Sequence, residues 1–260
     1  MILALKILLT PLLIAAATLA GRRWGPSISG WLIGFPLTSG PVSLILASQY
    51  GHQFAARAAI GTLAGQASVC VFCLAYSLAA QRRGWLACAL VAVGAFAAAE
   101  ITWDHFALAL VPTFAILLVT IAAVLKFMPP PAPSQGASNP PRWDLPARMV
   151  VATTFVILLT TFATALGPQL SGLLSPVPVF GIVLTTFAHR QQGAGAAMQV
   201  LRGIVLGSVA FAAFFVMVAA FVVSLATPVA YALATAAAVT ASGISLRSVR
   251  RVGAAPGQQP

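Results

Sequence analysis

Long apolar segments separated by short polar stretches occupy most of the chain. Nine of them can cross or nearly cross a bilayer, at residues 2–20, 28–48, 58–80, 85–101, 105–127, 147–166, 170–188, 203–225 and 228–246. One crossing takes roughly 20 apolar residues, and in lipid a helix satisfies its own backbone hydrogen bonds. The pattern therefore predicts an all-α, polytopic transmembrane protein of about nine helices.

The composition agrees with a membrane location. Hydrophobic residues make up 60% of the chain and charged residues only 7%, whereas a soluble domain has about 25% charged residues. The 14 Lys and Arg residues outnumber the 3 Asp and Glu residues, but they are scattered between the apolar segments. This scatter is typical of cytoplasmic loops rather than of a nucleic-acid-binding face. We expect membrane lipids as partners and no nucleic acid.

Two stretches differ from the membrane segments. Residues 129–146 are rich in proline and predict a cytoplasmic linker, and residues 247–260 predict a basic, disordered tail. The linker divides the chain into a four-helix unit at 1–101, a single helix at 102–128 and a second four-helix unit at 147–246.

The two four-helix units repeat each other. Shifting the sequence by 142 positions aligns 11 identical residues over the 41 positions 25–65 without a gap, and seven of the 11 are Gly or Pro. Shared apolar residues would only reflect two membrane segments, whereas shared Gly and Pro mark places where a helix breaks, bends or is closely approached. We infer that one unit was duplicated.

The basic residues predict how the units are oriented. With nine crossings, the N-terminus outside and the C-terminus in the cytoplasm, 12 of the 14 basic residues lie in cytoplasmic loops, and only Lys6 and Arg57 lie outside. Arg22 and Arg23 also favour a retained first helix over a cleaved signal peptide. Basic loops of one unit correspond to uncharged loops of the other. The units are therefore expected to be inverted, in a 4+1+4 arrangement typical of transporters.

The second segment of each unit is interrupted by proline and glycine. Pro36 and Pro178 each remove a backbone donor near the middle of a segment, which leaves carbonyl groups at membrane depth that need partners. Matched interruptions in inverted units point to a transport site, and a simple kink relieved by Ser and Thr is an equal alternative. The substrate-binding candidates at the two interruptions are Phe35, Pro36, Thr38, Ser39, Gly40, Pro176, Pro178 and Gly181.

A further matched feature is a pair of glycines four residues apart. Gly61 and Gly65 coincide with Gly203 and Gly207 under the same shift. Small residues at this spacing let two membrane helices approach closely. We expect these glycines to form a contact between helices, which recurs in both units and joins the third apolar segment to the second. We do not expect them to contact a ligand.

The ionisable residues offer one candidate for proton coupling. Glu100 lies with Asp104 and His105 near one membrane face. A carboxyl at membrane depth can relay protons, because burial favours its neutral form. A solvated outer turn is the simpler interpretation. His52 and His189 are expected in solvated loops.

The chain lacks the residue patterns of catalysis and of cofactor binding. It has no Ser-His-Asp order, no paired carboxylates on a helix, no phosphate-binding loop and no metal-ligand spacing. Cys70, Cys73 and Cys88 lie in apolar runs, where packing is the expected role. We expect no enzyme activity, no catalytic residue, no cofactor and no metal.

Both interruptions resemble one known family. The stretches Ser29-Gly-Trp-Leu-Ile-Gly-Phe-Pro-Leu-Thr-Ser39 and Ser171-Gly-Leu-Leu-Ser-Pro-Val-Pro-Val-Phe-Gly181 are similar to the Gly-x-x-x-x-(Phe/Leu)-Pro stretch of the GlpM-like family of small bacterial inner-membrane proteins. Members of that family are about half as long, so the resemblance implies a fused pair in the bacterial inner membrane. It implies no established activity. The second unit departs from the pattern by placing Pro176 beside Pro178 and lacking equivalents of Thr38 and Ser39.

Two functions of different class follow from these patterns. The first is a small-molecule transporter or exporter with a midplane site between the two interrupted segments. The alternative is a non-transporting accessory or scaffold subunit of an envelope-polymer assembly. A membrane enzyme comes third, because no nucleophile–base or carboxylate pair is present.

Overall fold

A computed structural model of the chain is helical throughout the part that it describes. It covers residues 2–103, 105–106, 109–130, 141, 143–166 and 178–253, contains no strand within these ranges, and describes side chains within 8–158 and 178–246. Among the residues whose side chains are described, five helices are long and apolar enough to cross a membrane: α4 (His52–Ala79), α5 (Trp85–Trp103), α6 (Leu110–Phe127), α10 (Ala194–Phe221) and the Thr227–Leu246 part of α11 (Thr227–Gly253). The prediction of an all-helical membrane protein is confirmed at this level.

The structure describes five further helices. They are α1 (Ile2–Trp24), α2 (Pro26–Ile33), α3 (Ser39–Tyr50), α7 (Asp144–Leu166) and α9 (Val179–Gln192). Two boundaries differ from the sequence prediction. α7 begins inside the expected linker, and α11 continues into the expected tail, where no Pro or Gly ends the helix before Gly253.

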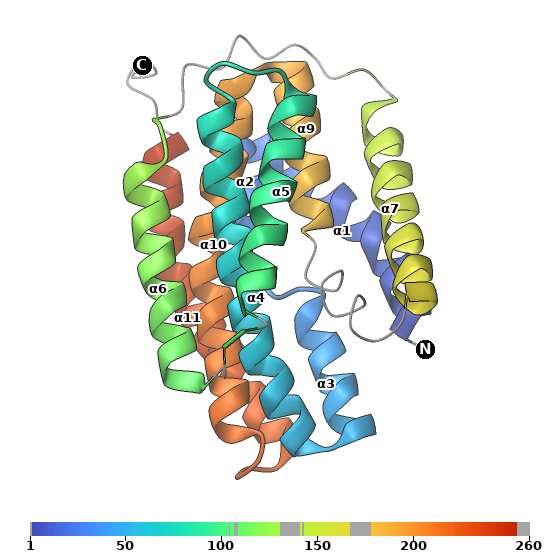
Figure 1. Cartoon of the computed structure of the whole chain (residues 1–260), viewed down its shortest axis with the longest axis vertical. Helices are drawn as coiled ribbons and strands as arrows, with labels where there is room; N and C mark the ends of the chain where they lie inside the picture. Colours follow the sequence, from blue (N-terminus) through green and yellow to red (C-terminus); the bar gives the residue numbers. More distant parts are fainter. Residues whose placement is uncertain are drawn as a thin grey trace.

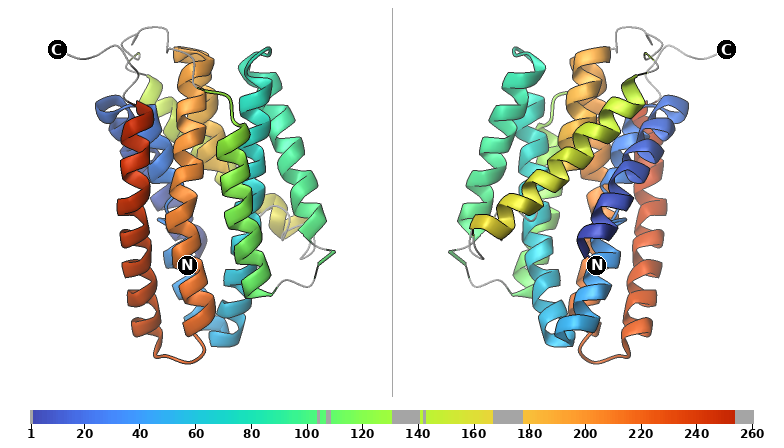
Figure 2. Two further views of the ribbon diagram at one scale, coloured as in Figure 1. Left: turned by 90° about the vertical axis from the view of Figure 1, so that its left-hand side faces the viewer. Right: turned by 90° about the vertical axis from the view of Figure 1, so that its right-hand side faces the viewer.

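α10 is the central helix of the bundle. It packs against α2, α4, α9 and α11, while α6 lies across both α4 and α10 (Figure 1). α1 packs against α2 and α7 on another side (Figure 2). Most of the largest apolar side chains on α10 are buried, among them Leu201, Val205 and Phe215.

The helices turn at two ends, which are the upper and lower ends in Figure 1. α1, α4, α6 and α9 end at the upper end, whereas α3, α5 and α10 end at the lower end. Basic residues gather at the upper helix ends, as at Arg22 and Arg23 of α1 and Arg190 of α9, while Arg57 follows the lower turn into α4. This is the grouping that the charge pattern predicts.

The helix bounds recur at the spacing of the sequence repeat. A shift of 142 positions carries both ends of α1 onto α7 and both ends of α4 onto α10, and it carries the start of α5 onto the start of α11. Gly51 and Gly193, which precede α4 and α10, have nearly the same left-handed φ values of 85° and 88°. Glycine adopts this conformation at little cost.

α2 and α10 approach each other through four glycines. A Cβ atom on Gly34 would lie 2.5 Å from the carbonyl oxygen of Ile204 and 2.8 Å from the Cα of Gly207. A Cβ on Gly203 would overlap the carbonyl oxygen of Ser27, and one on Gly30 would overlap that of Val200. The two backbones are therefore in direct contact, which only glycine permits.

This contact joins helices of different units. The sequence predicts that Gly203 and Gly207 pack against a second segment, and the structure places them against α2, which belongs to the first unit. A Cβ atom on the matched Gly61 would meet nothing within 4 Å among the described residues. The expectation of a contact at both glycine pairs is thus supported for one of them.

The centre of the bundle holds a buried polar contact. The Nε2 of Gln66 on α4 donates a hydrogen bond of 2.7 Å to the Oγ of Ser208 on α10. The Ser208 hydroxyl donates in turn to the carbonyl oxygen of Ile204, at 2.9 Å. Gln66 and Ser208 are 142 positions apart, so that equivalent residues of the two units touch each other.

We predict that Gly203→Ala destabilises the folded protein. The new methyl group would overlap the Ser27 carbonyl and force α2 away from α10, at a cost of about 1–3 kcal/mol. The melting temperature in detergent should fall. Gly94→Ala is the matched control, because Gly94 is exposed on α5 with open space around it. Equal melting temperatures of the two variants would contradict the close contact.

Candidate functional site

The first interruption separates α2 from α3. Pro36 has no backbone N–H, so the helix cannot continue through it. Instead the Leu37 N–H donates to the Phe35 carbonyl at 2.8 Å, and the Gly40 N–H donates to the Pro36 carbonyl at 3.0 Å. Pro36 is buried, and Phe35, Thr38 and Ser39 at the break are each half-buried.

The second interruption precedes α9. The Pro178 carbonyl accepts a hydrogen bond of 2.8 Å from the Ile182 N–H, which starts the helix. Pro178 is half-buried and Gly181 is buried. Pro176, the remaining candidate of this unit, lies outside the described residues.

The two interruptions meet the same turn of α10. A Cβ on Gly181 would lie 3.3 Å from Cδ1 of Ile204, and Gly34 touches the backbone of that same residue. Gly40 packs further along α10, where a Cβ would lie 3.3 Å from the ring of Phe214. Gly40 and Gly181, which are candidates from different units, thus both pack against α10, and Ile204 is contacted from the side of each break.

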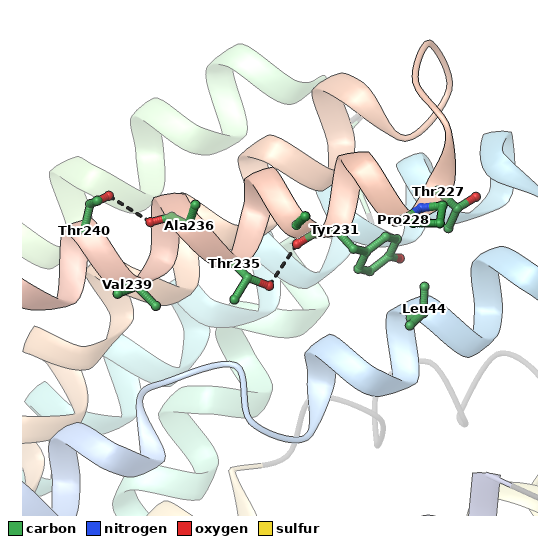
Figure 3. Close-up of a pocket in the computed structure, with 9 residues that line it drawn as sticks. Leu44, Thr227, Pro228, Tyr231, Thr235, Ala236, Val239 and Thr240 are labelled. Atoms are coloured by element: carbon green, nitrogen blue, oxygen red, sulfur yellow. Dashed lines mark hydrogen bonds between the residues drawn. The ribbon is translucent and has the colours of Figure 1, made fainter.

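A groove opens beside the first interruption. It has a volume of about 820 Å³ and lies between α11 and α3, with the connection from α2 to α3 running along the same side (Figure 3). Its lining residues are Leu44, Thr227, Pro228, Tyr231, Ala232, Thr235, Ala236, Val239 and Thr240.

The groove is apolar with a hydroxyl pair at its wall. The hydroxyl groups of Ser43 and Tyr231 lie 2.7 Å apart and are both buried. Thr235 and Thr240 donate their hydroxyls to carbonyl oxygens of α11, which leaves their methyl groups available to the groove (Figure 3). A ligand with an apolar body and a single polar group suits this lining.

Glu100, the candidate for proton coupling, lies in the last turn of α5. Its Oε1 is buried, although the residue as a whole is only half-buried. His105, after the end of α5, is exposed, and Asp104 lies outside the described residues. Glu100 and the two interruptions come from different elements, and proton coupling through Glu100 stays a prediction.

His189 differs from its prediction. It lies in the last turn of α9 rather than in a loop, and its Nδ1 is 3.1 Å from the hydroxyl of the buried Tyr76 on α4. The helix extends past the apolar segment because no breaker occurs before Gly193. His52 is exposed as expected, but it is the first residue of α4 rather than part of a loop, and its Nε2 lies 2.8 Å from Oγ1 of Thr227.

The residue that sequence reasoning missed is Asp144. At the upper end its carboxylate accepts hydrogen bonds from Arg22 of α1 at 3.0 Å, from Arg148 of α7 at 2.8 Å and from Gln191 of α9. Asp144 and Arg148 are almost completely buried, with side chains 1% and 6% exposed. These four residues, Arg22, Asp144, Arg148 and Gln191, are called the Asp144 cluster below.

Two signals in the sequence mark this cluster. Asp144 is one of only three acidic residues, and Arg148 follows it at the four-residue spacing that brings side chains together on a helix. Its place at the end of a proline-rich stretch hides the start of α7. The contacts with α1 and α9 have no local signature, because they join residues 122 and 47 positions apart.

The cluster changes the acidity of its carboxyl group. Burial raises the pKa of Asp144, but hydrogen bonds from Arg148 and Gln191, the charge of Arg148 and the hydrogen bond from Arg22 outweigh burial. The net pKa lies below its usual value of 3.8. The ionised form is therefore the one that stabilises the folded state.

The described residues hold no group of three or more His, Cys, Asp and Glu side chains that could bind a metal ion. Comparisons of the chain with models of known protein families, with curated proteins and with solved structures found no match. The resemblance to the GlpM-like family stays a prediction. The function is therefore argued from the geometry alone.

We predict that the Asp144 cluster makes stability depend on acid pH. A carboxyl whose pKa is lowered by folding stabilises the protein above its unfolded pKa, near 3.8, and this stabilisation is lost as the pH falls through the lower folded pKa. Asp144→Asn leaves Arg148 buried without its partner, which costs about 3–5 kcal/mol near neutral pH.

Melting temperatures of both proteins in detergent between pH 7 and pH 3 would check this. The difference in melting temperature between the wild type and Asp144→Asn should become smaller below about pH 4. Arg23→Gln, which changes an exposed arginine next to the cluster, is the control and should leave the profile unchanged. A gap that is constant across the whole range would contradict the prediction.

Proposed function

We propose that the protein is a membrane carrier for a small molecule, with its site at the interrupted segments beside α10. The observation that carries the proposal is the meeting of both interruptions at Ile204. Interrupted helices free backbone carbonyls and N–H groups at membrane depth, and carriers use such groups to bind their substrates. The groove between α3 and α11 lies on the side along which the connection from α2 to α3 runs.

We further propose that the two units form an inverted repeat. The recurrence of helix bounds at 142 positions supports a duplication, and the opposite directions of α4 and α10 in Figure 1 support inversion. The contact between Gln66 and Ser208 adds to this, because equivalent residues touch where a twofold axis passes between two copies. In such a fold, two states of similar energy can open opposite ends.

The groove favours a substrate with an apolar part. Its lining offers methyl groups along α11 and the hydroxyl of Tyr231, which is paired with Ser43 behind the groove, for a polar group of the substrate. Among the described residues, none of those that line it is charged. An accessory subunit in the inner membrane is the second candidate, supported by the rigid glycine contact between α2 and α10, which a static scaffold would also need.

We predict that the basic ends of the helices share one side of the membrane. In a background with Cys70, Cys73 and Cys88 replaced, Arg23→Cys and Arg190→Cys should be protected from an impermeant maleimide in intact cells. Arg57→Cys should react. Cell lysis should make all three reactive, which controls for burial. If one of the positions 23 and 190 reacted in intact cells and the other did not, the inverted arrangement would be contradicted. The proposed site at the interruptions would then be contradicted too.

We predict that Pro36→Ala and Pro178→Ala each reduce transport by about tenfold, because a continuous helix no longer offers free backbone groups at the site. The reduction in transport would be measured as uptake into vesicles, with a panel of labelled metabolites and an amphiphilic dye as test substrates. Pro11→Ala is the matched control, since Pro11 lies inside α1, away from both interruptions.

The possible outcomes separate the two candidate functions. Flux by the wild type that both Pro36→Ala and Pro178→Ala impair, while Pro11→Ala does not, supports the carrier. Equal flux of all variants at equal expression contradicts a site at the interruptions. The absence of flux together with stoichiometric co-purification of an envelope-polymer enzyme complex favours the accessory role.

A further inference from the structure

The Asp144 cluster ties three helices together at one end of the bundle. Arg22 lies in the last turn of α1, Asp144 and Arg148 in the first turns of α7, and Gln191 near the end of α9. A second link within the cluster runs from Arg148 to the side-chain carbonyl oxygen of Gln191 at 3.4 Å. Separating α1 from α7 therefore breaks the hydrogen bond from Arg22 to Asp144, and separating α7 from α9 breaks the two that link Gln191 to Asp144 and Arg148.

Such a cluster resists separation because the charges of Asp144 and Arg148 are buried. Ion pairs removed from water are stable only while each partner stays in place, since a single charge left behind is costly. Asp144 lies between the guanidinium groups of Arg22 and Arg148, and its loss would also leave two like charges facing each other. The guanidinium of Arg148 further stacks on Phe187 of α9, 5.0 Å from the ring centroid.

The repeat provides the comparison with the opposite end. A shift of 142 positions relates Arg148 to Lys6 and Gln191 to Gln49, so both units keep a basic residue and a glutamine at these places. The same shift relates Asp144 to Ile2 and Arg22 to Thr164. The acid and its second arginine, which complete the cluster, occur in one unit only.

We propose that the Asp144 cluster is a one-sided latch that keeps the upper end of the carrier closed. The matched positions hold Ile2, Lys6, Gln49 and Thr164, which lack the acid and the second arginine, so these four residues cannot form the same cluster. The resting protein therefore favours the state that opens at the lower end. This inference rests on the proposed function, because a latch regulates access only where two states alternate.

Thiol labelling at the two ends tests the latch. Ala188→Cys reports on the upper part of α9 and Ala47→Cys on the lower part of α3, and both positions are buried, at 4% and 3% exposure. Each is placed in the background without native cysteines, and the rate of reaction with a small maleimide is measured in membranes permeable to the reagent.

Asp144→Asn should raise the labelling rate at position 188 by about tenfold and lower the rate at position 47, because the two ends open alternately. Arg22→Gln removes only the half-exposed arm of the cluster and should have a smaller effect of the same sign. Asp144→Glu should restore part of the wild-type rates. Arg23→Gln, beside the cluster, should change neither rate.

Three results would overturn the latch. Unchanged rates in both Asp144→Asn and Arg22→Gln would exclude it. Faster labelling at both ends would show general loosening instead, and a fall in melting temperature without any change at position 47 would show a purely structural role. A reciprocal change without transport by the wild type would support the latch and contradict the carrier, whereas transport without a reciprocal change would contradict the latch alone.

Discussion

The direct backbone contact between α2 and α10 is the constraint on which the rest of the bundle depends. Lipid provides no hydrophobic force between helices, so a membrane protein relies on close packing to hold them together. The absence of side chains at Gly30, Gly34, Gly203 and Gly207 brings the two backbones into contact. The contact also fixes the position of the first interruption, because Gly34 is its first residue and lies against Ile204.

Three of the buried polar contacts among the described residues join different helices. Gln66 and Ser208 join α4 to α10, Ser43 and Tyr231 join α3 to α11, and Asp144 joins α7 to α1 and α9. An unsatisfied polar group in an apolar medium is costly, so each such pair favours one arrangement of its helices over the alternatives. In a chain that is 60% hydrophobic, these pairs supply the specificity that apolar packing alone does not.

The same contacts divide the bundle into parts that hold together and parts that can separate. α2 is held on α10 by glycines, whereas the chain between Ile33 and Ser39 is not helical. In the proposed carrier, a shift of α3 against α11 would widen or close the groove between them. The Asp144 cluster acts at the other end, on α1, α7 and α9. The two regions are therefore distinct in position and in chemistry.

The sequence by itself determined the helical membrane fold, the interruption at Pro36 and the gathering of basic residues at one end. Each of these has a local cause, namely apolar length, a missing N–H group and charge placed next to an apolar segment. Only the tertiary structure decided that Gly203 meets α2 of the other unit, and that Asp144 binds Arg22 and Gln191. Those choices depend on which helix faces come together across long stretches of chain, and no local pattern of residues specifies that pairing.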